Sequence, residues 1–280
     1  MNKGRCILLL LTLIVIISCT KSDKKDSKEP EYSVFELNEM VIKALDEKDY
    51  EVAEEILDKG ADPNLVYQNR SLLYICSKYT LTRLGLKAID KGADVNWISD
   101  EKITPLSFCI TKDNLELGKA IIENNLDYTY KDEHRHNYFA ICLFEEKYDF
   151  VDLLLSNSAI YDTIKNDYMN FHPLIYYWTS KTPELITRIY GENFTVPDEV
   201  PVLLISIGMR NYDAVKYFID KGVDKNKEYY FEDDEEYVTP LSRAKSLKFR
   251  LTHYLGSDTR YTEEDDVVKT VNAIIQLLEE

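Results

Sequence analysis

Two histidines close together in the sequence are the first candidates for chemistry. The stretch DEHRH places His134 and His136 on either side of one residue, directly after two acids. Histidines at this spacing on a strand or hairpin can share one metal ion, and such a site would suit a metal-dependent hydrolase. A third and a fourth ligand are not evident. We therefore favour a solvated connector and expect no metal site.

Two acidic stretches also offer oxygen ligands. FEDDEEY, residues 231–237, contains five consecutive acids, which could bind calcium or a basic partner, but it lacks the spaced ligands and the glycine of a calcium loop. DKGADPN, residues 58–64, carries Asp62 and Asn64, which are residue types that form turns by bonding their own backbone. We interpret the first stretch as a solvated loop or a partner contact, and the second as structural.

Sequence motifs of catalysis are missing. The chain contains no glycine-rich phosphate loop, no Gly-x-Ser-x-Gly turn and only four histidines. With nine glycines in 280 residues, few segments could cradle a phosphate. We predict a protein that is not an enzyme and that binds no cofactor.

A constant block of residues recurs along the chain. A helix-turn-helix pattern spans it, with helices predicted near 38–46 and 50–58 in the first copy, and connectors of variable length join the copies. A Gly or Asn at the end of the block supplies the left-handed residue that stops the second helix. The same separation of 21 residues joins Glu39 and Gly60, Ser71 and Gly92, Thr104 and Asn125, Asn137 and Ser158, His172 and Asn193, and Pro201 and Gly222.

The pattern resembles ankyrin repeats. TPL at 104–106 and at 239–241 matches the family's opening, and GADPN at 60–64 and GADVN at 92–96 match its closing phrase. The phrase GVDKN at 222–226 matches less fully, and units four and five match weakly. The resemblance implies an all-α ankyrin-repeat solenoid of about seven helix-turn-helix units over residues 34–280, acting as a monomer.

The last unit departs from the pattern. Its opening helix is followed by a long insertion at 252–266, and then by apolar residues at helical spacing from Val267 to Leu278. We predict that this final run forms a C-terminal cap helix with a polar outer face.

The resemblance also implies where a partner would bind. In the family, connector tips and first helices line a concave protein-binding face, and exposed aromatic residues are favoured anchors of interfaces. Several of the 21 tyrosines fall in connectors. By register, the candidate partner-binding residues are Tyr67, Gln68, Asn69, Trp97, Ser99, Glu101, Tyr130, Asp132 and His134.

Three cysteines recur at one position of the repeat. Cys76, Cys109 and Cys142 are spaced by 33 residues, and in other units the same position holds Ala44, Tyr177, Ser206 and Ala244, so six of the seven residues are small. Small residues at one register position indicate a crowded site that faces the neighbouring unit. Equivalent atoms of stacked units lie about 10 Å apart, which is too far for a disulfide.

The N-terminus has the features of an export signal. Lys3 and Arg5 precede an apolar run that is too short to span a membrane. The sequence IISC at 16–19 resembles a bacterial lipobox, which implies that residues 1–18 are removed and that Cys19 carries lipid. Residues 19–33 are mostly charged or small and would form a tether. We expect a lipoprotein anchored in the bacterial cell envelope.

The net charge restricts the class of partner. The formal charge is −16, so nucleic acid and anionic headgroups are disfavoured as ligands. We expect a protein partner, with a basic one favoured by this charge, and membrane contact only through the lipid. The leading hypothesis is a non-catalytic protein-binding scaffold. The alternatives are an inhibitor or immunity protein for an envelope enzyme or toxin and, less favoured, the hydrolase around His134 and His136.

Overall fold

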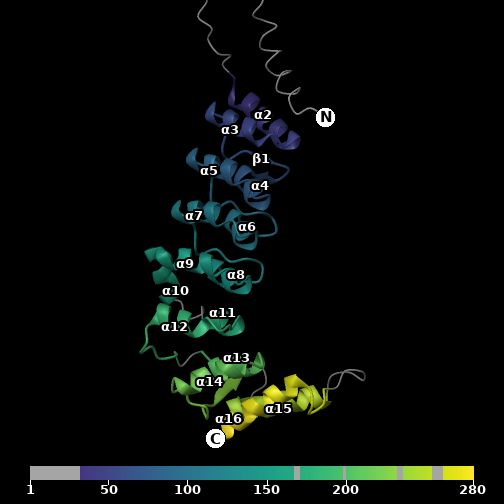
Figure 1. The fold of residues 1–280 in the computed structure, drawn as a ribbon, viewed down its shortest axis with the longest axis vertical. Coiled ribbons are helices and arrows are strands. Elements are labelled where there is room, and N and C mark those ends of the chain that lie inside the picture. The colour runs from purple at the N-terminus through teal and green to yellow at the C-terminus, as the bar shows by residue number, and fades with distance from the viewer. Residues whose placement is uncertain (1–31, 167–170, 198–199, 232–235, 254–260) are drawn as a thin grey trace, which may run out of the picture.

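Seven helix-turn-helix pairs stack in chain order into an elongated solenoid (Figure 1). The computed structural model describes residues 32–166, 171–197, 200–231, 236–253 and 261–280. The first helices of the pairs are α2 (Val34–Glu47), α4 (Leu72–Lys78), α6 (Pro105–Thr111), α8 (Tyr138–Phe144), α11 (Phe171–Tyr176), α13 (Val202–Gly208) and α15 (Pro240–His253). The second helices are α3 (Tyr50–Asp58), α5 (Thr82–Asp90), α7 (Leu115–Glu123), α9 (Tyr148–Ser156), α12 (Thr182–Tyr190), α14 (Tyr212–Asp220) and α16 (Asp266–Glu279).

Polar caps start the helices at the repeating positions. The side chains of Ser71, Thr104 and Asn137, one per unit, accept hydrogen bonds from backbone amides in the first turns of α4, α6 and α8. In the first unit, Ser33 and Glu36 form a reciprocal capping box. That box starts α2 at Val34, four residues before the start expected from the apolar pattern.

In five of the seven pairs, the turn between the two helices contains a non-glycine residue with positive φ, which the sequence pattern did not single out. Lys48, Thr80, Asp113, Glu146 and Arg210 all have a φ between 55° and 59°. Non-glycine residues rarely adopt this left-handed conformation. Backbone bonds hold it here, since the next amide returns to the first helix, as from Asp49 N to Ala44 O at 2.8 Å.

The closing phrases end the second helices as expected. Gly60 and Gly92 have φ values of +102° and +94°, and Asn125 takes the same left-handed role with φ 54°. The expectation fails in units four and five. Ser158 there begins another helix, and Gly191 rather than Asn193 is the residue with positive φ.

The asparagines of the closing phrases connect one unit to the next. Asn64 Oδ1 accepts from Asp94 N at 2.7 Å, and Asn64 Nδ2 donates to Gly92 O at 3.2 Å. Asn96 repeats both bonds one unit later, to Asp127 N at 2.7 Å and to Asn125 O at 2.9 Å. The sequence had suggested only local turns, and the structure adds an amide ladder between units.

The cysteine position is crowded, as predicted. Cys76, Cys109 and Cys142 are fully buried and not bonded to one another. Burial disfavours the thiolate, raising the pKa of Cys109 to about 12 and also raising those of Cys76 and Cys142.

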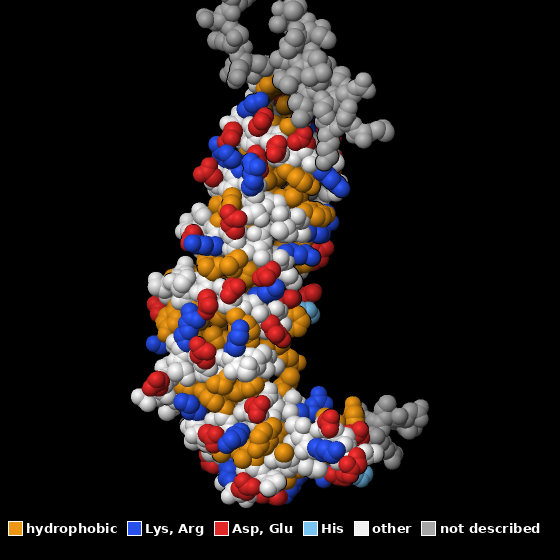
Figure 2. All heavy atoms as spheres, in the orientation of Figure 1, with side chains coloured by type: hydrophobic (Ala, Val, Ile, Leu, Met, Phe, Trp, Pro, Cys, Tyr) orange, Lys and Arg blue, Asp and Glu red, His pale blue; other side chains and the backbone are white. Residues whose placement is uncertain are grey.

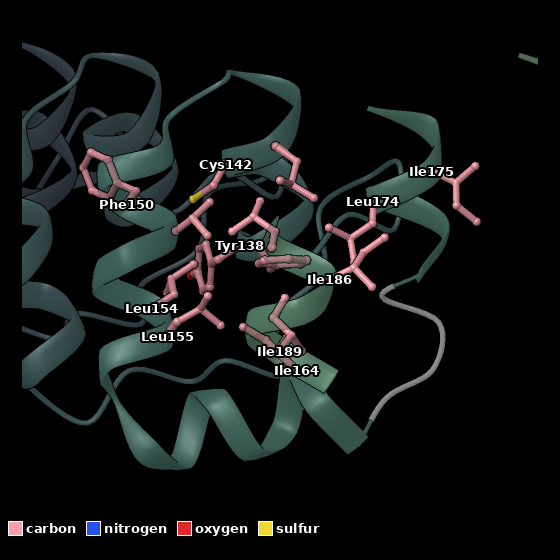
Figure 3. Packing of buried hydrophobic residues seen from close by; sticks show 14 of the residues in the cluster. Tyr138, Cys142, Phe150, Leu154, Leu155, Ile164, Leu174, Ile175, Ile186 and Ile189 are labelled. Atoms are coloured by element: carbon pink, nitrogen blue, oxygen red, sulfur yellow. The ribbon is translucent and has the colours of Figure 1, made fainter. Parts of the chain in front are cut away.

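A helix that the sequence did not predict follows the fourth pair. The helix α10 (Ser158–Asn166) begins after Asn157, whose side chain accepts from Ala159 N and Ile160 N. Ile160 and Ile164 are 3% exposed, and α10 contacts both α9 and α12. Figure 3 shows Ile164 near Leu155 and Ile189. The segment predicted to be a weak closing phrase is therefore an added part of the core.

The seventh pair ends the solenoid with a one-sided helix, which is the predicted cap. Along α16 the buried residues are Val268, Val271, Ile274 and Leu278, and Lys269 and Gln276 lie on the exposed side. Two short antiparallel hairpins lie between units: β1 (Val66–Tyr67) with β2 (Arg70–Ser71), and β3 (Tyr229–Phe231) with β4 (Glu236–Val238). Residues 232–235 of the acidic stretch and residues 254–260 of the insertion lie outside the described residues, as does Cys19.

Candidate protein-binding face

The first connector forms a hairpin finger with an exposed tip. Gln68 and Asn69 turn the chain with φ values of 49° and 58°. The Tyr67 hydroxyl donates to the Asp46 carboxylate at 3.0 Å, and Asn69 Nδ2 donates to Asp100 Oδ2, in the next finger, at 2.6 Å. The three predicted tip residues are thus accessible but held in place.

A hollow of about 530 Å³ lies between this finger and the adjacent helices. Its walls include Tyr67 and Gln68 of the finger together with Tyr50 and Tyr79. The side chain of Tyr79 is 57% exposed, at the end of α4. An exposed aromatic ring beside a hollow is the kind of feature that anchors a protein partner.

The second connector uses its predicted residues partly for its own packing. The ring of Trp97 meets that of Tyr74 edge to face, with 5.1 Å between centroids. Ser99 is 8% exposed, and its hydroxyl accepts from Ile103 N at 3.0 Å. Glu101 is exposed. Ser99 therefore stabilises the finger and is removed from the candidate face.

The third connector requires the same correction for Tyr130. Its ring stacks on that of Tyr138 at 4.7 Å, its hydroxyl donates to Lys102 O, and it is 7% exposed. Burial raises its pKa above the usual range of tyrosine. A buried ring that is bonded to the preceding finger is not free to contact a partner. Tyr130 is therefore not part of the candidate face.

Of the remaining two residues of that connector, His134 lines a second hollow and Asp132 lies in the finger beside it. Asp132 Oδ1 accepts from His134 N at 2.9 Å and from His136 N at 2.7 Å, so the carboxylate shapes the tip. The hollow, of about 540 Å³, lies between this finger and the helices α8 and α11. His134, His136 and His172 line it, together with Tyr176 and Tyr177.

The metal hypothesis gains no support from this geometry. The rings of His134 and His136 lie 5.8 Å apart between centroids. His136 is engaged by Asp132 at 3.4 Å and by the Tyr177 hydroxyl at 3.2 Å. Over the residues that the structure describes, no group of three or more His, Cys, Asp or Glu side chains could hold a metal ion.

Some exposed aromatic residues were missed because the sequence reasoning searched the connectors. Phe144 and Tyr176, 60% and 55% exposed, end the first helices α8 and α11, as Tyr79 follows α4. Figure 2 shows hydrophobic side chains recurring along the edge where α4, α6 and α8 lie. An aromatic residue at the last turn of a short helix was the available signal.

Several features of the architecture occur together and identify the fold. Paired helices at a constant spacing, hairpin fingers between them, left-handed closing residues and a terminal cap occur together. The fold is an all-α ankyrin-repeat solenoid. The predicted fold class is confirmed, including the seven pairs within the described residues.

Comparisons with known proteins add little beyond this fold. No protein-family model matches the chain, and no curated protein matches it. Solved structures that match include the crystal structure of EF0377, an ankyrin repeat protein. It is 15% identical, with 89% of this chain and 98% of that chain covered, at a TM-score of 0.43. The ankyrin-repeat assignment above therefore rests on the geometry of the chain itself.

Proposed function

We propose that this protein is a non-catalytic scaffold that binds another protein on the face formed by its fingers and first helices. The observation that carries the proposal is the exposure of Tyr79, Phe144 and Tyr176, which follow or end first helices. Two of these residues line the hollows beside the fingers. Aromatic side chains with little conformational freedom are effective anchors of protein interfaces.

Photo-crosslinking in the native cell tests this proposal. A photoreactive amino acid placed at Tyr67, Tyr79, Phe144 or Tyr176 is expected to give discrete crosslinked products. The same residue at Glu51 or Glu116, exposed on the second helices α3 and α7, serves as the matched control. We expect no product from the control positions, because the proposed face excludes them. Equal products from both sets, or none from the first set, would refute the proposal.

We further propose that the scaffold is held in the bacterial cell envelope by lipid on Cys19. The support is the IISC sequence at 16–19 and the charged segment that follows it. Among the described residues, no helix combines the length and the apolar character needed to cross a membrane.

Replacing Cys19 tests the anchor. Two acyl chains contribute about 0.8 kcal/mol per buried methylene group, so their loss should release the protein. We expect Cys19→Ala to move it from the membrane fraction to the soluble fraction, as measured by fractionation and immunoblotting. Cys6→Ala, within the leader, is the control and should remain in the membrane fraction. Membrane retention of Cys19→Ala would contradict the anchor.

A further inference from the structure

We propose that the hollow between the third finger and the helices α8 and α11 binds an acidic segment of the partner protein. The inference rests on the proposed protein-binding function and specifies one subsite of that face. It concerns the side chains of Lys131, His134, Arg135, His136 and His172, which all line this hollow.

The hollow concentrates groups that can bind an anion. It contains three of the four histidines of the chain, together with one lysine and one arginine, and no Asp or Glu is among its lining residues. The chain as a whole carries a formal charge of −16. Lys131 and Arg135 are the two formal cations among these lining residues, and on an acidic protein they attract a carboxylate that most of the surface repels.

The nearby acids are engaged within the finger. Asp132 accepts from two backbone amides and lies 3.4 Å from His136 Nδ1, and its side chain is only 20% exposed. Glu133 lies 3.6 Å from His134 Nε2. Among the described residues, no carboxylate lies within ion-pair distance of Lys131 or Arg135. These two cations therefore remain available to a ligand.

Hydrogen bonds within the finger hold the backbone that carries these side chains. Arg135 has φ 65° and its amide donates to Asp132 O at 3.0 Å, while Asp132 N donates to His136 O at 2.9 Å. His136 lies between the Asp132 carboxylate and the Tyr177 hydroxyl, which restrains its ring. A preorganised tip loses less entropy when a ligand binds.

The other wall of the hollow is partly apolar. Ala140, Pro173 and Tyr176 contribute to it, and the ring of Tyr176 is 55% exposed. Partial burial lowers the pKa of His172, so this ring is neutral at neutral pH and offers hydrogen bonds without charge. The chemistry fits a carboxylate next to an aromatic or aliphatic side chain, as in an acidic peptide, with Arg135 able to bind the carboxylate through two N–H groups.

Peptide binding to the full-length chain in detergent tests the inference. The probe is a fluorescent peptide in which Glu alternates with Tyr and Leu, and its neutral partner has Gln in place of Glu. We expect the acidic peptide to bind at low salt, and the neutral peptide to bind at least about tenfold more weakly. The double variant Lys131→Glu/Arg135→Glu should weaken binding of the acidic peptide by about tenfold or more.

Lys119→Glu/Lys216→Glu is the charge-matched control, because both lysines are exposed on second helices, α7 and α14, outside the hollow. It should leave the affinity within about twofold, and thermal unfolding should show that each variant is folded. Equal weakening by the control, or equal binding of the two peptides, would overturn the inference. Competition by inorganic phosphate at the affinity of the peptide would also overturn it, since the hollow would then be a general anion site.

The same variants separate this inference from the proposed function. If Lys131→Glu/Arg135→Glu leaves crosslinking unchanged at every position of the face, including Tyr176, the acidic-segment inference fails and the scaffold proposal stands. If no position of the face gives a crosslinked product, the scaffold proposal itself is refuted. Loss of crosslinking at Tyr176 alone in the double variant would support the inference.

Discussion

Gly118→Ala is expected to destabilise the protein by about 2 kcal/mol, although alanine normally stabilises a helix relative to glycine. A Cβ at this position of α7 would overlap the ring of Phe150 and lie 3.3 Å from Cys109 Cβ. Phe150 is fully buried between units, so its rigid ring cannot move without disturbing the stack. The cost of overpacking should exceed the gain in helix propensity. Urea unfolding of the variant and the wild type measures the difference.

Two other glycines provide matched controls. At Gly85, one unit earlier, a Cβ would meet the flexible methyl ends of Leu117 at 2.9 Å and lie 3.2 Å from Cys76 Cβ, so Gly85→Ala should cost clearly less than Gly118→Ala. At Gly208, no atom lies within 4 Å of the added Cβ, and Gly208→Ala should stabilise by roughly 0.5–1 kcal/mol.

Phe150→Leu offers a rescue. Leucine at this position recreates the Gly85–Leu117 arrangement one unit further along, so Gly118→Ala/Phe150→Leu should recover stability relative to the sum of the two single changes. Equal effects of Gly118→Ala and Gly85→Ala would show that the Phe150 contact is unimportant.

Ile274→Asp in α16 is expected to unfold the seventh pair, at a cost of several kcal/mol. Ile274 is fully buried in the face that α16 turns toward the solenoid. An unpaired carboxylate there must either remain in an apolar environment or open the cap, and an opened cap exposes the apolar side of α14, which contacts α16.

Ala273→Asp is the control on the same helix, because Ala273 is exposed. Hydrogen exchange should rise across α14 to α16 in Ile274→Asp and stay near the wild-type rate in Ala273→Asp. Aggregation during refolding should increase only in the first variant. Equal exchange in the two variants would contradict the role of α16 as the cap.

The stacking of the units was predictable because each copy has to repeat the same contacts. The constant 21-residue block, the small residues at the positions of Cys76 and Cys109, and the apolar period of α16 all follow from that need. The caps at Ser71 and Thr104 depend only on nearby residues, because each side chain accepts a hydrogen bond from an amide of the helix that it starts.

The predictions that were wrong concern residues whose contacts follow no periodic pattern in the sequence. The helix α10 is stabilised by burying Ile160 and Ile164 against elements before and after it, so its own sequence shows only a broken repeat. Ser99 and Tyr130 occupy connectors, but a finger needs an interior of its own, and these residues fill it. Sequence register therefore located the fingers, while the three-dimensional packing decides which of their side chains face solvent.

The asparagine ladder has a mechanical consequence. Asn64 and Asn96 tie their units across each junction, and Thr129, at the equivalent place in the third unit, instead turns its hydroxyl to Asp127 of the same turn at 2.7 Å. Just beyond that point, α10 lies between α9 and α12 and interrupts the row of second helices. A pull along the long axis would therefore stretch the molecule unevenly. The N-terminal units would resist as one stiff segment, and the compliant joint would lie beside the hollow of the third finger.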